Sequence, residues 1–215
     1  MIIAIDGPAA AGKGTLARRL AEAYGFALLD TGLLYRAVGM KVVAADGDLD
    51  DEEGAARAAR ALRPDELSNP ALRSDAAAQA ASKVAAIAPV RAALLDFQRT
   101  FAHQPPSPAK GAILDGRDIA TTVCPDAEIK LFVTASAEIR AKRRYKELLD
   151  RGLSAIYARV LEDLEERDAR DKARAVSPLV AAPDALVIDT SAMDADRVFA
   201  TAVDFIKSRN VGERP

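Results

Sequence analysis

The stretch IIAIDGPAAAGKGT, residues 2–15, carries the strongest structural signal in this sequence. Its first four residues are apolar and mostly β-branched, as expected of a strand that is buried on both faces of a parallel sheet. A glycine-rich segment follows, and from residue 15 to residue 24 apolar side chains recur at the three- and four-residue steps of a helix. A strand, a glycine loop and a helix in this order predict one unit of an α/β fold.

The glycine loop has the composition of a phosphate-binding loop. Its backbone N–H groups can surround a polyphosphate, Lys13 can reach the β- and γ-oxygens, and the Thr15 hydroxyl can bind Mg²⁺. The strict motif has Ser or Thr directly after the lysine, whereas Gly14 intervenes here. The competing interpretation is a plain strand-to-helix turn with a solvated lysine. The residues expected at the polyphosphate are Gly7, Pro8, Ala9, Ala10, Ala11, Gly12, Lys13, Gly14 and Thr15.

Composition excludes several classes of protein. The chain has 215 residues and a formal charge of −2, with 50% hydrophobic and 29% charged residues. These values argue against a disordered chain and against a general nucleic-acid or membrane-surface binder. One cysteine, Cys124, and one histidine, His103, exclude an intramolecular disulfide and a Cys/His zinc site. The N-terminus lacks the basic segment of a secretion signal, and no apolar run reaches the ~18 residues of a membrane span, so we expect a cytoplasmic protein.

Most of the remaining chain alternates between apolar runs typical of buried strands and amphipathic stretches typical of helices. Residues 51–102 differ, because they are rich in alanine, broken at Pro64 and Pro70, and without a strand pattern. We expect a single domain with an α/β core at about 1–50, 110–135 and 175–215, a helical insertion at about 51–102 and a helical arm at about 140–172. Strands are predicted at residues 2–5, 26–29, 112–114, 129–133 and 185–188.

Three further segments carry arginines close to predicted element ends. Residues 29–36 (LDTGLLYR) and 115–118 (DGRD) each follow a strand, and residues 167–174 (RDARDKAR) are expected to follow a long helix. In a parallel sheet, the loops that follow strands lie at the carboxyl edge, which is also the edge of the phosphate loop. The sequence therefore predicts several arginines around one phosphate site.

Taken together, the Gly-Lys-Gly-Thr loop, the Asp-Gly-Arg-Asp string and the Arg-Asp-x-x-Arg-Asp-x-x-Arg series resemble those of the bacterial cytidylate kinases, within the nucleoside-monophosphate kinase superfamily. The resemblance runs over nearly the whole chain. It implies a P-loop kinase core with about five parallel strands, a helical monophosphate-binding insertion and a helical lid. It also implies ATP- and Mg²⁺-dependent phosphorylation of CMP and dCMP in pyrimidine nucleotide metabolism. We expect a monomer that acts on small molecules, without nucleic-acid or membrane partners.

The chemistry of the motif residues agrees with a phosphate acceptor. A monophosphate has a second pKa of about 6, so its attacking oxygen is largely ionised at neutral pH and needs no general base. No motif contains a histidine. Such a site has to align two anions and neutralise the charge that spreads over the transferred group. Arginine suits this task, because it is always charged and can bind two phosphate oxygens at once.

The resemblance implies a role for each matching residue. Asp118, Arg91 and Ser82 would read the cytosine base, and Arg140, Arg143 and Arg144 would belong to the lid. A carboxylate that faces a uracil carbonyl is repelled, so CMP should be preferred over UMP by at least about one order of magnitude. The catalytic residues would be Lys13, Arg117, Arg167 and Arg170, and Mg²⁺ would be bound by Thr15 and, through a water, by Asp115. The set expected to bind CMP is Thr31, Tyr35, Arg36, Ser82, Arg91, Asp115, Arg117, Asp118, Arg167, Asp171 and Arg174.

Two features depart from the family pattern. Ala10 stands where many relatives have glycine, and a left-handed backbone there would cost alanine about 1 kcal/mol. The insertion is also too short between residues 62 and 82 for the small antiparallel sheet of many relatives.

Other interpretations remain open. Plain structural roles compete at single positions: Asp115 and Asp118 suit helix N-caps, and Tyr35 suits packing. For the whole chain, the alternatives are another small-molecule P-loop kinase, such as an adenylate, uridylate or shikimate kinase, and a nucleotide-hydrolysing regulatory module. Asp118 together with Arg91 argues against the first alternative. The lack of a guanine-reading Asn-Lys-x-Asp string argues against the second.

Overall fold

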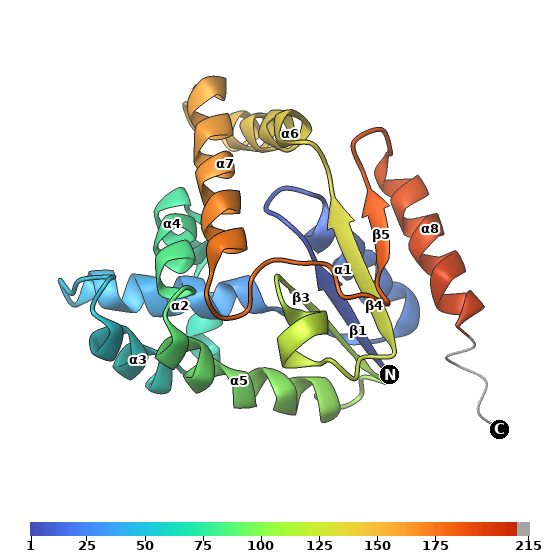
Figure 1. Cartoon of the computed structure of the whole chain (residues 1–215), viewed down its shortest axis with the longest axis horizontal. Helices are drawn as coiled ribbons and strands as arrows, with labels where there is room; N and C mark the ends of the chain where they lie inside the picture. Colours follow the sequence, from blue (N-terminus) through green and yellow to red (C-terminus); the bar gives the residue numbers. More distant parts are fainter. Residues whose placement is uncertain (210–215) are drawn as a thin grey trace.

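A computed structural model describes residues 1–209 and has a five-stranded, fully parallel sheet with the order β2-β3-β1-β4-β5 (Figure 1). The predicted α/β fold with about five parallel strands is therefore confirmed. Residues 210–215, which the sequence assigned to the core, lie outside the described part of the chain. The strands are β1 (Ile2–Asp6), β2 (Ala27–Asp30), β3 (Ala112–Gly116), β4 (Ile129–Thr134) and β5 (Leu186–Asp189).

The central strand β1 is buried along its whole length, and its alternating side chains enter two separate cores. Ile2 and Ala4 pack with residues of α2 (Thr31–Ala44) and α5 (Ala88–His103). Ile3 and Ile5 pack with residues of α1 (Lys13–Tyr24) and α8 (Ala195–Ser208) on the opposite face. Burial of both faces explains why β1 is apolar at nearly every position rather than at every second one.

The insertion is helical throughout, as its alanine content predicts. It consists of α3 (Glu52–Arg60), two short 3-10 turns (Pro64–Ser68 and Pro70–Arg73), α4 (Asp75–Val84) and α5. Helices α2 and α4 pack very closely at Gly39, where a Cβ atom would lie 2.7 Å from the Cβ of Ala80. A small residue at this crossing lets α4 lie directly against α2 and brings its residues towards the sheet edge.

Two long helices, α6 (Ala137–Asp150) and α7 (Tyr157–Ala173), lie at the end of the sheet towards which β4 and β5 point (Figure 1). A small apolar cluster that includes Ala141, Leu148 and Leu164 holds them together, and Ala9 of the phosphate loop packs against it. None of the helices among residues 1–209 is long and apolar enough to span a membrane.

The prediction that residues 167–174 follow the long helix is wrong for most of this segment. Helix α7 continues through Ala173, so Arg167, Arg170 and Asp171 lie on its last two turns. The apolar periodicity ends at Leu164, but the charged residues that follow are compatible with a helix, and their packing against neighbouring elements maintains it. The consequence is that the helical spacing of this segment determines which arginine faces which part of the site.

Candidate active site

The phosphate loop connects β1 to α1 at the carboxyl edge of the sheet, and its shape depends on glycine at two positions. Gly7 has φ 143°, and a Cβ there would lie 1.9 Å from the Val133 carbonyl oxygen of the adjacent strand β4. Gly12 has φ 97° and directly precedes the first residue of α1. Both conformations are unfavourable for residues with a side chain. Gly7 and the buried Pro8 therefore shape the loop, whereas the later loop residues line cavities.

Ala10 adopts the left-handed backbone conformation, the one of the two possibilities at this position that is strained for alanine. Its φ is 59°, in the region where an L-residue meets its own carbonyl group. Because Ala10 lines two cavities beside the loop, of about 600 and 180 Å³, the strain lies at the edge of these cavities rather than in a remote turn. The loop therefore carries local backbone strain of about 1 kcal/mol in this chain.

Replacing Ala10 with glycine should relieve this strain and stabilise the fold. For a chain of this size, about 1 kcal/mol corresponds to a rise in Tm of roughly 2–4 °C. Thermal unfolding followed by circular dichroism measures it. The matched control is Ala9→Gly, because Ala9 is the neighbouring alanine without a positive φ, and there glycine should lower Tm or leave it unchanged. A lower Tm for Ala10→Gly would contradict the interpretation.

Lys13 is almost completely buried under the loop. Its ammonium group donates a hydrogen bond of 2.9 Å to the Pro8 carbonyl oxygen and lies 3.8 Å from a carboxylate oxygen of Asp115. Burial, and next the nearby Arg117, lower the pKa of Lys13 to about 8, while Asp115 opposes this change. Burial in turn raises the pKa of Asp115. Lys13 is therefore held by the loop itself and by one carboxylate.

Cationic side chains from four elements converge on a cavity of about 180 Å³ beside Lys13. Arg36 comes from α2, Arg117 from the loop after β3, Arg167 from α7, and Arg174 directly follows α7. Except for Asp171, every residue that the sequence assigned to CMP lines this cavity. The ten are Thr31, Tyr35, Arg36, Ser82, Arg91, Asp115, Arg117, Asp118, Arg167 and Arg174.

Arg167 is the least satisfied of these cations. Its buried Nε atom has no hydrogen-bond partner among residues 1–209, and neither has Nε of Arg174. Burial, and next the like charge of Arg117, lower the pKa of Arg167 to about 9. A buried guanidinium without a partner is unfavourable unless something else supplies the acceptors. Because Arg167 lines the cavity, an anion with several oxygens, such as a phosphate, fits the unmet need.

Asp171 lies behind the cavity and holds two of the arginines. One carboxylate oxygen accepts a hydrogen bond of 3.0 Å from Nε of Arg117, and the other forms an ion pair with Arg174. Burial would raise the pKa of Asp171, but Arg117 and Arg174 more than offset it and hold the pKa below its usual value. Asp171 thus remains ionised and fixes the two guanidinium groups relative to α7.

The far end of the cavity has a different chemistry, built around a buried ion pair of Arg91 with Asp118. Arg91 also donates to the Ala85 carbonyl oxygen at 3.2 Å, and its guanidinium lies 5.6 Å from the ring centre of Tyr35. Ser82 is buried in the same wall. A carboxylate, a guanidinium and a hydroxyl on one wall can read the hydrogen-bonding edge of a base. Tyr35 contributes to this wall by packing under Arg91.

Two hydroxyl-bearing residues of the predicted site, Thr31 and Thr15, differ in exposure. The Thr31 hydroxyl donates a 2.9 Å hydrogen bond to the Asp115 carbonyl oxygen, so it joins β3 to the start of α2. Thr15 is exposed on the first turn of α1. Asp115 lies beside the same turn, because one of its carboxylate oxygens is 3.5 Å from the position of a Cβ atom added to Gly14. A hydroxyl oxygen and a carboxylate beside the phosphate loop are the donor types that Mg²⁺ prefers, so the residues present fit this ion.

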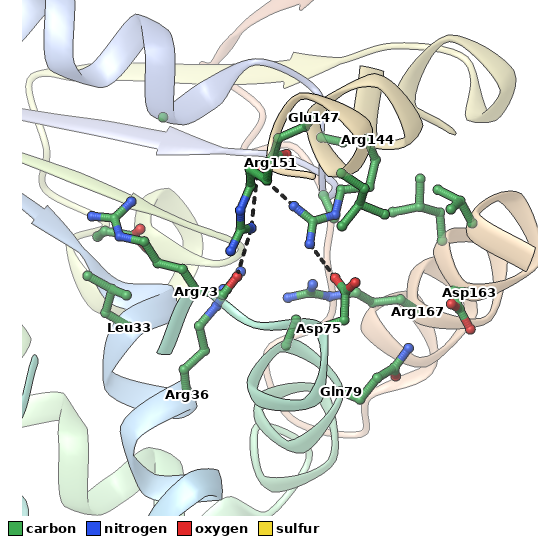
Figure 2. Close-up of a pocket in the computed structure, with 18 of the residues that line it drawn as sticks. Leu33, Arg36, Arg73, Asp75, Gln79, Arg144, Glu147, Arg151, Asp163 and Arg167 are labelled. Atoms are coloured by element: carbon green, nitrogen blue, oxygen red, sulfur yellow. Dashed lines mark hydrogen bonds and ion pairs between the residues drawn. The ribbon is translucent and has the colours of Figure 1, made fainter. Parts of the chain in front are cut away.

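A larger cavity of about 600 Å³ adjoins the first and lies between the phosphate loop, α2, α4, α6 and α7. Figure 2 shows Arg36, Arg144 and Arg167 around it, with Asp75 opposite Arg144. The Arg144–Asp75 ion pair joins α6 to the start of α4, and Arg151 donates to the Arg73 carbonyl oxygen at 3.3 Å. Helix α6 and the residue that follows it therefore contact the insertion.

The other two arginines assigned to a lid, Arg140 and Arg143, form hydrogen bonds with other parts of the protein. Arg140 is buried and forms a two-pronged ion pair with Asp168, with bonds of 3.2 and 2.7 Å, and it also reaches the Ala9 carbonyl oxygen at 3.3 Å. Arg143 donates to the hydroxyl and to the carbonyl oxygen of Thr190 at 2.8 and 2.6 Å. In this structure Arg140 holds α6 against the phosphate loop, Arg143 holds it against the segment after β5, and neither arginine lines the cavities of about 180 and 600 Å³.

Sequence reasoning missed two residues that position the site. Asp6, at the end of β1, accepts hydrogen bonds of 2.8 Å from the backbone N–H groups of both Ile119 and Ala120, directly after Asp118. Burial raises the pKa of Asp6 to about 7, although these two bonds oppose it. Thr190 donates to the Ala11 carbonyl oxygen at 3.0 Å. An acid at the end of an apolar strand is a weak sequence signal for Asp6, and Thr190 belongs to no motif.

A third cavity, of about 290 Å³, lies on the other side of the phosphate loop. The loop and the first turn of α1 contribute Gly12 and Thr15, helix α6 contributes Arg143, the segment after β5 contributes Met193, and the start of α8 contributes Ala195. The phosphate loop thus borders separate cavities, an arrangement in which two phosphorylated molecules could lie with their phosphates facing each other at the loop.

Known proteins resemble this chain over nearly its full length. A family model described as cytidylate kinase matches residues 3–208. A cytidylate kinase of Paramagnetospirillum magneticum is 65% identical over 97% of this chain and 98% of its own length, and one of Rhodospirillum rubrum is 57% identical over 98% and 99%. A crystal structure of an uncharacterized protein from Eubacterium ventriosum matches with a TM-score of 0.54 at 16% identity, covering 97% of this chain and 99% of the other, a similarity of fold alone.

Proposed function

The chain belongs to the cytidylate kinase family, and on this premise we propose that it transfers the γ-phosphoryl group of ATP to CMP, and also to dCMP, to give the diphosphate and ADP. It is a nucleoside-monophosphate kinase. The observation that carries the proposal is the guanidinium of Arg167, whose buried Nε atom has no hydrogen-bond partner among residues 1–209, at a cavity with a wall suited to reading a base. The alternatives of another small-molecule kinase or a hydrolysing switch are not favoured.

The two substrates are proposed to occupy the cavities on opposite sides of the phosphate loop. CMP would lie in the cavity of about 180 Å³, with its base against Asp118, Arg91 and Ser82 and its phosphate between Arg36 and Arg117. The triphosphate of ATP would follow the loop, with its nucleoside in the cavity of about 290 Å³ beyond Thr15. All these residues belong to one chain, so a monomer is the proposed catalytic unit. The proposed setting is the cytoplasm, where both nucleotides occur.

Transfer needs alignment and charge neutralisation rather than a general base. The attacking CMP oxygen is already ionised at neutral pH, so no side chain has to remove a proton. Lys13 and Arg167 would bind the group in transit, and Arg117 would hold the acceptor phosphate at the proper distance for in-line attack. Because the fold brings these cations to one cavity, little reorganisation would accompany the reaction. Burial strengthens their interaction with the phosphates by excluding water.

The residues beside the loop also suit Mg²⁺, which would be held by the Thr15 hydroxyl and, through a water, by Asp115. Bound Mg²⁺ supplies charge neutralisation between the β- and γ-phosphates. The role of Asp115 in this scheme is to keep its negative charge close to Lys13, so that the loop is not left with an excess of positive charge once one substrate has departed.

The proposed function is tested by a coupled ADP-release assay with ATP and Mg²⁺, run in parallel with CMP, dCMP, UMP, AMP and no acceptor. Turnover led by CMP and dCMP is the expected result. Turnover led by another acceptor would preserve the kinase chemistry and overturn the assignment of the base pocket. ADP release that is independent of any acceptor would instead support a nucleotide-hydrolysing module.

The pH dependence of ATP use should reveal the state of Lys13. Its pKa of about 8 in the ligand-free chain means that it loses its proton above this pH, and neutral lysine attracts phosphate less. Since kcat/KM reports the free enzyme, kcat/KM for ATP should fall about tenfold per pH unit above pH 8. At saturating ATP the phosphates favour the charged lysine, so kcat/KM for CMP should lack this step. A parallel decline of both profiles would assign the titration to another group.

A further inference from the structure

We propose that Arg170 is a positioning residue that holds the Ser82 hydroxyl in the base pocket and thereby increases the preference for cytosine over uracil. The inference rests on the proposed function and deepens it. The sequence suggested a different role for Arg170, at the transferred phosphoryl group. Its geometry points to the base instead.

The Arg170 guanidinium is directed at α4, away from Lys13. Its Nε donates to the Ser82 hydroxyl at 3.2 Å and one terminal nitrogen donates to the Gln79 side-chain oxygen at 2.8 Å. The other terminal nitrogen lies 3.6 Å from Glu166 on the preceding turn of α7. Arg170 is also absent from the linings of the three cavities that border the phosphate loop. Unlike Arg167, one helical turn earlier, Arg170 has a protein partner for each of its three guanidinium nitrogens.

Ser82 needs such a partner because of its place in the fold. It lies within α4, is 2% exposed and lines the cavity that Asp118 and Arg91 also line. A serine inside a helix tends to turn its hydroxyl back to the carbonyl oxygen four residues earlier. The described part of the chain gives this hydroxyl no hydrogen bond except the one from Arg170. Arg170 thus occupies one lone pair from outside the helix and leaves one lone pair and the hydrogen for the base.

A held hydroxyl discriminates better than a free one. Cytosine and uracil differ in the donors and acceptors of their pairing edge, so a group that can rotate adapts to both, whereas a fixed group suits one. Arg170 also links the base wall to α7, the helix that carries Arg167 and Asp171. The same interaction that selects the base therefore attaches the insertion to the helix that contributes to the phosphate site.

The test compares kcat/KM for CMP and for UMP in Arg170→Met, which retains most of the side-chain length but loses every donor. The CMP-to-UMP ratio should fall by roughly tenfold, the effect of one hydrogen bond to a charged group. Glu166→Gln is the matched control, because it removes the one partner of Arg170 that does not contact the insertion, and it should leave the ratio unchanged.

A double-mutant cycle shows whether Arg170 acts through Ser82. In a Ser82→Ala background, Arg170→Met should produce no further change in the ratio. If Arg170→Met instead lowers kcat equally for CMP and UMP with an unchanged ratio, the proposal is wrong and the residue acts on the phosphoryl group or on the fold. Arg170→Gln is tested in parallel in case the methionine variant fails to fold. Failure of the wild-type chain to phosphorylate CMP would overturn the proposed function itself, a distinct outcome.

Discussion

Replacing Arg167 with methionine should lower kcat by about a thousandfold and, in the same variant, raise the thermal stability of the ligand-free protein. The loss of rate follows from removing one preorganised cation from a phosphoryl group in transit, for which arginines typically contribute about 10³–10⁵. The gain in stability follows from the resting state, where the Nε atom of Arg167 is buried without a partner. Removing a poorly satisfied buried charge relieves its desolvation and its repulsion by Arg117.

The expected changes in kcat and Tm have opposite signs, so the two measurements test the prediction separately. Initial rates at saturating ATP and CMP give kcat, and thermal unfolding without ligand gives Tm. Arg159→Met is the matched control, because Arg159 is an exposed arginine on the same helix, and both quantities should stay near their wild-type values. A loss of kcat of less than about tenfold would show that Arg167 does not stabilise the transferred phosphoryl group. A clear fall in Tm would show that its guanidinium already has adequate partners in the protein.

Several of the cations around the cavity have a carboxylate partner within the protein. Arg117 and Arg174 are held by the buried carboxylate of Asp171, Arg91 by Asp118, and Lys13 by Asp115 and the Pro8 carbonyl oxygen. Arg167 is the member of this group left without such a partner in the described residues. The fold thus pairs several of these cations with carboxylates, whereas Arg36 has only the Leu72 carbonyl oxygen and Arg167 has no hydrogen-bond or ion-pair partner among residues 1–209.

Much of the fold was predictable because its signals are local. Strand β1 is apolar on both faces, the insertion is rich in alanine, and the loops after parallel strands share one edge by topology. For this reason the segments around Arg36, Arg117 and Arg167 could be expected together, although 131 positions separate the first from the last. Such juxtaposition requires only the order and direction of the elements.

The remainder depends on contacts that a sequence pattern does not encode. The continuation of α7 through Arg170 is decided by packing and ion pairs, and it turns Arg170 towards α4 instead of the phosphates. The role of Asp6 could not be predicted from sequence either, because it accepts hydrogen bonds from two backbone N–H groups more than a hundred positions away. The left-handed conformation of Ala10 is set by the loop closing around Lys13, against the preference of alanine.

Replacing Asp118 with asparagine should shift the base preference strongly from CMP towards UMP. Its effect on this preference should be larger than its effect on kcat. Asparagine keeps the shape of the side chain but replaces one acceptor oxygen with a donor. The amine of cytosine then loses its acceptor, whereas the carbonyl oxygen of uracil gains a donor in the same place. Each half of the change is worth about 1–3 kcal/mol, so the ratio of kcat/KM for CMP to that for UMP should fall by about a hundredfold or more.

The buried partner Arg91 makes the choice of variant important. Removing the whole carboxylate, as in Asp118→Ala, would leave Arg91 buried without a counter-charge and would endanger the fold. Asparagine retains one acceptor for Arg91, and the Ala85 carbonyl oxygen and the Tyr35 ring still contact the guanidinium. The control Asp96→Asn, at an exposed position on the helix of Arg91, should leave the ratio unchanged. Equal losses on CMP and UMP in Asp118→Asn would show that Asp118 supports the pocket without reading the base.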